Sequence, residues 1–330
     1  MNQERRRILL AGAAGILAPA ARALAQPSAR KYRIAVMFSV PLAYSAPYRA
    51  VLVEQLAAHG FTEGKNLTID AHPSLSFEVD RKLMAEQLAA KPDAMFVTTT
   101  RVTEAALAET RLVPIVFAWV ADPVTSSLVK DYARPGGNVT GVSNRFFEVA
   151  VKRLELLREL LPAAKRVALT GPMYLPELEA ATARLREVSH RLGFEPKTVD
   201  TGASTQVSAI EGAIKGGAQA LLPLQNYSER GQRISGEQVV RLANERRIPV
   251  IFAESELVDA GGLMTFGTNL LEDVRRAAEM LAKVLRGTKP AELPVNQASR
   301  FEMAVNLKTA RAIGIRVPPS ILLRADRVIE

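Results

Sequence analysis

The sequence predicts an α/β protein built from two doubly wound parallel-sheet lobes that are joined by hinge strands. Short apolar runs alternate with amphipathic helical stretches, the pattern of a parallel sheet covered by helices. The same order of elements restarts about halfway along the chain. The length of 330 residues also suits two lobes, because single cores seldom grow beyond ~250–300 residues.

The first set of elements begins with Arg33–Phe38, a continuous apolar run typical of a strand buried on both faces. A helix follows, with apolar residues on one face and Gly60 placed to end it. The further elements predicted in this set are strand 67–70, helix 78–90, strand 94–98, helix 102–109 and strand 115–119.

The second set begins with strand Arg166–Thr170 and a helix that ends at Gly193, as the first helix ends at Gly60. Residues 111–118 are echoed by residues 246–253. The offsets are 133 residues for the glycines and 135 for this second match, so they are nearly constant. A constant offset favours an internal duplication, although generic α/β segments can also match by coincidence.

The last part of the chain is expected to recross between the lobes. A long amphipathic helix from Leu270 is followed by a proline-bounded stretch and then a strand at 301–305. We therefore expect lobe one to comprise residues 31–145 plus about 270–293. Lobe two should comprise 146–269 plus about 300–330.

Residues 1–25 are typical of an export signal. Arg5–Arg7 form a basic start, residues 8–18 are apolar, and Ala23–Ala25 provides a small-x-small cleavage site. The apolar run is shorter than the ~20 residues that a membrane span needs. The arginines resemble a twin-arginine signal, and both the Tat and the Sec routes stay open. We expect a periplasmic protein, and without cysteine it cannot be a lipoprotein.

Composition excludes several functional classes. The absence of cysteine rules out disulfides, thiolate metal sites and a Cys nucleophile, and only three histidines are present. Cleavage after Ala25 would remove four arginines and Glu4 and reduce the net charge from +9 to +6, too mild for nucleic-acid binding. We expect no metal, no cofactor and no catalytic residue, because no nucleophile–base or phosphate-loop motif is complete.

Polar and aromatic side chains follow several predicted strands. Because ligands of open α/β sheets bind beyond the carboxyl ends of the strands, these residues are the candidates for a binding site. They are Ser39, Tyr44, Thr98, Thr99, Thr100, Trp119, Asp122, Gln225, Asn226, Tyr227, Glu254, Glu256 and Asn269.

The segment Thr98–Arg101 lies where a helix should begin, and such a position favours a carboxylate or another anion. Plain helix capping explains the threonines equally well. Asp122 could hold an ammonium group, or it could cap a helix that starts near Val124 with Pro123 in its first turn. Both pairs of alternatives remain open from the sequence.

The aromatic and acidic candidates also have two interpretations each. Trp119, Tyr44 and Tyr227 could stack on a flat ligand, or they could belong to the core. Glu254 and Glu256 could accept hydrogen bonds from a ligand, or they could be solvated loop charges.

Three blocks of sequence form a recognisable set. They are Gly60–Asn66 (GFTEGKN), a central block that includes Ala133–Gly141 (ARPGGNVTG), and a C-terminal block made of Asn306–Ala310 and Pro318–Asp326. These blocks resemble a family of bacterial ABC-transporter substrate-binding proteins. The resemblance covers the chain from about Lys31 to Glu330. It implies a type I periplasmic-binding-protein fold with three hinge crossings, and relatives that bind tryptophan and related aromatic amino acids.

The leading hypothesis is a solute-binding component of an ABC importer. It would capture a small molecule, such as an amino acid or aromatic carboxylate, between the lobes by hinge closure. Its partners would be an ABC permease and a cytoplasmic ATPase, and it would contact the membrane complex only peripherally, as a monomer. The alternatives are a periplasmic ligand sensor, an exported enzyme that uses Glu254 with Asp122, and a transcription-factor effector domain.

Overall fold

The first sheet of the protein has six parallel strands. In the computed structural model, their spatial order is β11-β5-β4-β3-β1-β2. The structure describes residues 30–39, 42–74, 76–171, 173, 176–201, 206–224 and 236–330. Residues Lys31–Glu330 form one compact unit, to which everything below refers. The strands are β1 (Tyr32–Phe38), β2 (Leu67–Pro73), β3 (Ala94–Thr98), β4 (Ile115–Val120), β5 (Val139–Ser143) and β11 (Asn296–Gln297).

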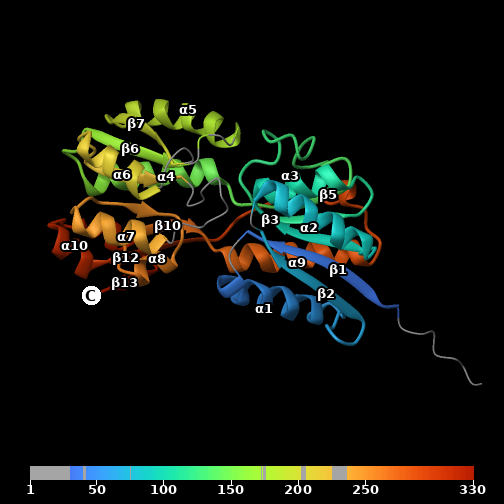
Figure 1. The fold of residues 1–330 in the computed structure, drawn as a ribbon. Coiled ribbons are helices and arrows are strands. Elements are labelled where there is room, and N and C mark those ends of the chain that lie inside the picture. Colours follow the sequence, from blue (N-terminus) through green and yellow to red (C-terminus); the bar gives the residue numbers. More distant parts are fainter. Residues whose placement is uncertain are drawn as a thin grey trace, which may run out of the picture. The chain divides into compact units, whose positions relative to one another are not determined.

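Both faces of this sheet are covered by helices, as the continuous apolar strands predict (Figure 1). Along β1, Ile34 and Val36 pack on one face while Ala35 and Met37 pack on the other. The first face is covered by α1 (Leu42–Ala58) and α9 (Leu270–Leu285), and the second by α2 (Phe77–Ala89) and α3 (Thr99–Glu109). A short 3-10 helix, η2 (Pro290–Glu292), precedes β11.

The second set of strands forms two hydrogen-bonded groups, ordered β7-β6-β8 and β13-β12-β10-β9. A parallel bridge between Leu221 and Val250 connects them. The strands are β6 (Arg166–Gly171), β7 (Glu195–Asp200), β8 (Ala220–Pro223), β9 (Ile251–Phe252), β10 (Met264–Thr268), β12 (Phe301–Asn306) and β13 (Arg327–Ile329).

Seven helices of the described residues accompany these strands, and two apolar clusters fill the space between them. Arg153 is a fully buried charged residue on the first of these helices. The helices are α4 (Phe146–Leu160), α5 (Pro176–Arg191), α6 (Gln206–Lys215), α7 (Gly236–Glu245), α8 (Glu256–Asp259), α10 (Leu307–Ile313) and α11 (Pro319–Leu322).

The chain passes between the two sets of strands three times. It leaves the first sheet after β5, returns after β10 to form α9, and leaves again between β11 and β12. β10 and β12 are antiparallel, whereas the sequence predicted only parallel strands. The reason is that β10 leads out of the second set and β12 leads back into it, so the adjacent segments run in opposite directions.

Most predicted elements lie within a few residues of the observed ones, and the helix ends at Gly60 and Gly193 are confirmed. Both glycines have positive φ angles of 87° and 79°, a conformation that glycine adopts without strain. Several boundaries differ from the prediction. α3 begins at Thr99 rather than Val102, and β2 extends to Pro73 rather than to residue 70. The segment after Asp122 forms turns, so the alternative of a helix starting near Val124 is wrong.

Candidate functional site

The ends of three neighbouring strands in the first sheet have strained backbone. Thr99 follows β3 with φ 68°, Trp119 in β4 has φ 61°, and Arg145 follows β5 with φ 52°. Residues other than glycine rarely adopt positive φ, and β-branched or bulky residues least of all. The pairing of β4 with β5 also shifts register between Ala118 and Val120. Such strain is concentrated at functional sites in proteins. This edge of the sheet is therefore a candidate binding site.

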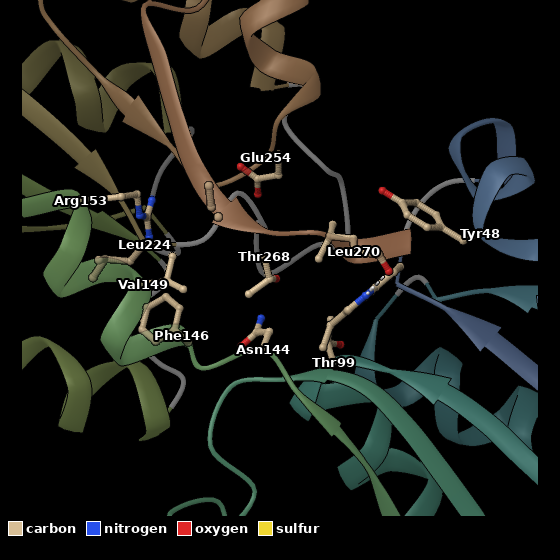
Figure 2. A pocket seen from close by; sticks show the side chains of 13 residues that line it. Tyr48, Thr99, Asn144, Phe146, Val149, Arg153, Leu224, Glu254, Thr268 and Leu270 are labelled. Atoms are coloured by element: carbon tan, nitrogen blue, oxygen red, sulfur yellow. Dashed lines mark hydrogen bonds between the residues drawn. The ribbon is translucent and has the colours of Figure 1, made fainter. Parts of the chain in front are cut away.

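A pocket opens beside these strand ends, and Figure 2 shows its lining side chains. Its empty space, including the part open to solvent, is about 800 Å³. The lining combines apolar, aromatic and polar groups from both sets of strands, as is typical of small-molecule sites. The lining residues are Tyr48, Thr99, Trp119, Asn144, Phe146, Val149, Arg153, Leu224, Ala253, Glu254, Gly267, Thr268 and Leu270.

One end of the pocket is aromatic. The rings of Tyr48 and Trp119 meet edge to face with their centroids 4.8 Å apart. The indole Nε1 of Trp119 donates a hydrogen bond to the backbone oxygen of Leu270, 3.2 Å away. Trp119 is only 5% exposed and packs in the apolar cluster of the first sheet. It therefore belongs to the core and lines the pocket at the same time, so the two interpretations of this residue do not exclude each other.

The opposite end contains Arg153 beside apolar side chains of α4 (Figure 2). Its guanidinium is fully buried, and Nη1 donates a 2.7 Å hydrogen bond to the backbone oxygen of Pro223. Burial lowers the pKa of Arg153 from 12.5 to about 10, and the negative charge of Glu254 opposes this shift. The group therefore stays cationic at neutral pH although its side chain is buried.

A buried acid stands behind the pocket wall. Asp273 in the first turn of α9 is 2% exposed, and burial raises its pKa from 3.8 to about 7. A hydrogen bond with Thr268, which lines the pocket, opposes the shift. The wall at this point therefore contains a carboxyl group that ionises near neutral pH.

Three of the candidates from the sequence line this pocket, namely Thr99, Trp119 and Glu254. The neighbouring hydroxyls serve the fold instead. The Oγ1 of Thr98 accepts a 2.7 Å hydrogen bond from the backbone N–H of Ser39 and also pairs with the hydroxyl of Ser39. Both residues are buried at the strand ends. Thr100 is buried as well, and its Oγ1 accepts a 3.4 Å hydrogen bond from the backbone N–H of Ala121.

Three other described candidates, Asp122, Asn269 and Glu256, are not among the residues that line the pocket. Asp122 accepts hydrogen bonds from Val124 and Thr125, so it caps a turn, and the enzyme alternative that paired it with Glu254 gains no support. Asn269 caps α9 by accepting from the backbone of Glu272. Glu256 is exposed at the start of α8, and it lines a different, acidic hollow.

Four candidates lie wholly or partly outside the described residues. Gln225, Asn226 and Tyr227 lie outside the described residues. Tyr44 lies within α1, and its side chain is outside the described part as well.

Several lining residues were missed by the sequence analysis. Tyr48 lies in α1, whose predicted counterpart was considered only for its apolar face, and Asn144 follows β5, a strand that the sequence analysis did not predict. Phe146, Val149 and Arg153 repeat at i, i+3 and i+7 along α4. A charged residue within that apolar stripe was the signal that could have pointed to this helix.

The sequence model of one protein family, described as ABC transporter substrate binding protein, matches residues 34–329. This chain belongs to that family. Proteins of this family bind small ligands and work with ABC transporter components, and they are typically extracytoplasmic. The family and its structural neighbours are binding proteins rather than enzymes.

Individual relatives of this ABC transporter substrate-binding protein agree with the assignment. A tyrosine-binding protein from Clostridioides difficile is 26% identical over 266 residues, which cover 80% of this chain and 75% of that protein. The ligand-free, open structure of a Clostridium difficile substrate-binding protein with adhesive properties has a TM-score of 0.66 at 26% identity. It covers 90% of this chain and 99% of that one.

A second solved structure, an ABC domain from Streptococcus pneumonia in complex with L-Trp, has a TM-score of 0.78 at 22% identity. It covers 91% of this substrate-binding protein and all of that chain. At this identity the likeness establishes the fold, which is that of the type I periplasmic binding proteins. Within the described ranges, no helix is both long and apolar enough to cross a bilayer.

Proposed function

We propose that this protein is the extracytoplasmic solute-binding component of an ABC importer, and that it captures its ligand in the pocket lined by Tyr48, Trp119, Arg153 and Glu254. The two sets of strands would act as lobes, divided near residue 145 and again at the crossings after β10 and β11. The ligand would favour the closed arrangement by binding it more tightly than the open one. The protein would act as a monomer, leave its ligand chemically unchanged and deliver it to a permease.

The observation that carries this proposal is the composition of the pocket. It joins an aromatic end, formed by Tyr48 and Trp119, to a charged end with Arg153 and Glu254. Both sets of strands contribute to the lining, so a ligand held there would contact both. Such contacts are what couples ligand binding to closure in hinged proteins.

The ligand class that fits this lining is an amino acid or another carboxylate with a flat, apolar part. An aromatic ring would meet Tyr48 and Trp119 at one end, and charged groups would lie near Arg153 and Glu254 at the other. The relative named for tyrosine binding supports the aromatic amino acids as the first compounds to test. Residues 1–25 are proposed to be the export signal that takes the chain to the periplasm.

A binding screen tests this function. The purified mature protein would be heated with aromatic amino acids, aromatic acids and nucleosides, and bound compounds would be confirmed by calorimetry. A ligand present at 100 times its Kd should stabilise the folded state by about 2.7 kcal/mol. If no compound raises the melting temperature, this pocket does not serve as a receptor for these classes.

Two tyrosines provide a matched pair of variants for the screen. Tyr48 and Tyr32 are both partly buried and both meet an aromatic ring edge to face, Trp119 at 4.8 Å and Phe61 at 5.0 Å. Only Tyr48 lines the pocket. Tyr48→Ala should weaken ligand binding, whereas Tyr32→Ala should lower stability alone. Equal effects of the two substitutions on affinity would place the ligand elsewhere.

A further inference from the structure

Arg153 lines the pocket, and only part of its buried guanidinium is hydrogen-bonded among the described residues. Nη1 is occupied by the backbone oxygen of Pro223, 2.7 Å away. Nε and Nη2 are both buried, and neither has a hydrogen-bond partner among the described residues. Leaving a buried donor unsatisfied is unfavourable, and more so for a charged group. The pocket-lining side chain of Arg153 therefore has two donor atoms without an acceptor in the described part of the chain.

The geometry of these two donors selects the acceptor. In a guanidinium, the N–H of Nε and one N–H of Nη2 point in the same direction along one edge. This edge matches the two oxygens of a carboxylate and forms two parallel hydrogen bonds with it. A neutral carbonyl or amide presents only one oxygen, which the two donors would have to share, and it carries no negative charge.

Most side chains of the segment Thr98–Arg101, which the sequence analysis considered as an anion site, already have partners within the fold. Thr98 binds Ser39, and Thr100 binds the backbone of Ala121. Arg101 forms an ion pair with the buried Asp80, with an N–O distance of 2.6 Å. Thr99 alone of this run lines the pocket. The side chains at the start of α3, apart from that of Thr99, therefore already have partners within the fold.

We propose that the Nε–Nη2 edge of Arg153 binds the carboxylate of the ligand, and that this contact makes the protein selective for carboxylates. This inference rests on the proposed function, since it assigns a role within the same pocket. The contact with Arg153 would also orient the ligand. Arg153 and Tyr48 lie at opposite sides of the pocket (Figure 2), so the carboxylate would lie against α4 and the remainder would extend toward Tyr48.

Calorimetry with matched compounds tests the assignment. The probes are L-tyrosine, L-tyrosinamide and tyramine, together with the corresponding forms of tryptophan and phenylalanine. The amide keeps the ring and the amine but lacks the carboxylate, and tyramine lacks the carboxyl group altogether. Because hydrogen bonds to charged groups contribute about 1.5–3 kcal/mol, the wild-type protein should prefer the acid over the amide by about 10- to 100-fold.

The variants separate Arg153 from its charge. Arg153→Met should reduce affinity for the acid by about 10- to 100-fold and change affinity for the amide by less than about threefold, so the preference disappears. Arg153→Lys keeps the charge, loses the two-donor edge and should also lose most of the preference. Lys152→Met is the control, because it removes the same charge from an exposed neighbour on α4 that pairs with Glu155. It should leave both affinities unchanged.

The outcomes distinguish the two proposals. If the amide or tyramine binds as tightly as the acid, or if folded Arg153→Met or Arg153→Lys retains the preference, carboxylate recognition by Arg153 is wrong while the receptor function stands. If no form of the three amino acids binds the wild-type protein, the proposed ligand class fails and this inference fails with it. Circular dichroism of each variant establishes that it is folded, and Arg153→Lys decides the matter if Arg153→Met does not fold.

Discussion

The carboxyl group of Asp273 should make the stability of this protein depend on pH. It is 2% exposed in the first turn of α9, and its Oδ2 has no hydrogen-bond partner in the described part of the chain. Burial raises its pKa from 3.8 to about 7, against the hydrogen bond with Thr268 and the positive charge of Arg276. The negative charge of Glu272 adds to the rise.

The sign of the effect follows from which state holds the proton. Between pH 3.8 and about 7, the folded protein keeps a proton on Asp273 that the unfolded chain has already released. The contribution of Asp273 to the free energy of unfolding is therefore fully present below pH 3.8, and it is lost as the pH rises toward 7. Because one pKa unit corresponds to about 1.36 kcal/mol, raising the pH from 5 to 7.5 should lower the free energy of unfolding by about 2–3 kcal/mol.

Asparagine is neutral at every pH, so Asp273→Asn removes this dependence. Urea denaturation of the wild type and the variant at pH 5 and pH 7.5 should show the variant gaining about 2–3 kcal/mol relative to the wild type at the higher pH. Glu155→Gln is the control, because this exposed carboxylate of α4 pairs with Lys152 and is not among the groups that shift the pKa of Asp273. A stability difference between Asp273→Asn and the wild type that is the same at both pH values would refute this reasoning.

Three further predictions concern the pocket and its frame. Trp119 is the only tryptophan in the chain, and it lines the pocket. Its fluorescence, excited at a wavelength where tyrosine does not absorb, should therefore change when a ligand without tryptophan binds. The change should vanish in Trp119→Phe. Gly267→Ala should destabilise the protein by more than about 4 kcal/mol or prevent folding, because its Cβ would lie 1.9 Å from the backbone oxygen of Ala253. In thermal melts, Gly287→Ala, whose Cβ would meet nothing within 4 Å, should cost only about 1 kcal/mol through its positive φ. Thr98→Val should cost about 1–2 kcal/mol in urea melts by leaving the N–H of Ser39 unpaired, and its ratio of acid to amide affinity should equal that of the wild type.

Much of the fold could be predicted because its signals are local. β3 matches its predicted bounds, and the glycines at 60 and 193 end helices as expected. The antiparallel pairing of β10 with β12 depends on where the chain travels between the two sets of strands, and no local pattern encodes that path. α3 begins three residues earlier than predicted, and its first residue, Thr99, has φ 68°, a conformation that propensity does not anticipate for threonine.

The site could be predicted only where it follows strand ends. Thr99 and Trp119 were found because side chains at the carboxyl ends of parallel strands converge. Arg153 lies in the middle of a helix, and its contribution depends on how α4 packs against β8, where Pro223 accepts its hydrogen bond. The sequence analysis did not predict α4. The helical spacing of Phe146, Val149 and Arg153 is consistent with one shared face, but such spacing cannot tell a buried guanidinium from one that reaches solvent.

The two ends of the pocket hold their side chains in different ways. At the first sheet, the positive φ angles of Thr99 and Trp119 each store about 1–3 kcal/mol of strain. This strain persists because neighbouring contacts fix the backbone on both sides, among them the bond between Thr98 and Ser39 and the packing of Trp119 in the core. At α4, the guanidinium of Arg153 forms one hydrogen bond within the described residues, to the backbone oxygen of Pro223. The aromatic wall is thus fixed by several contacts of the fold, whereas Nε and Nη2 of Arg153 have no acceptor in the described part of the chain. A ligand that supplies those acceptors would stabilise the Arg153 end of the pocket far more than the aromatic end. Substitutions at Arg153 should therefore change ligand selectivity, whereas substitutions behind Trp119 should change the stability of the fold.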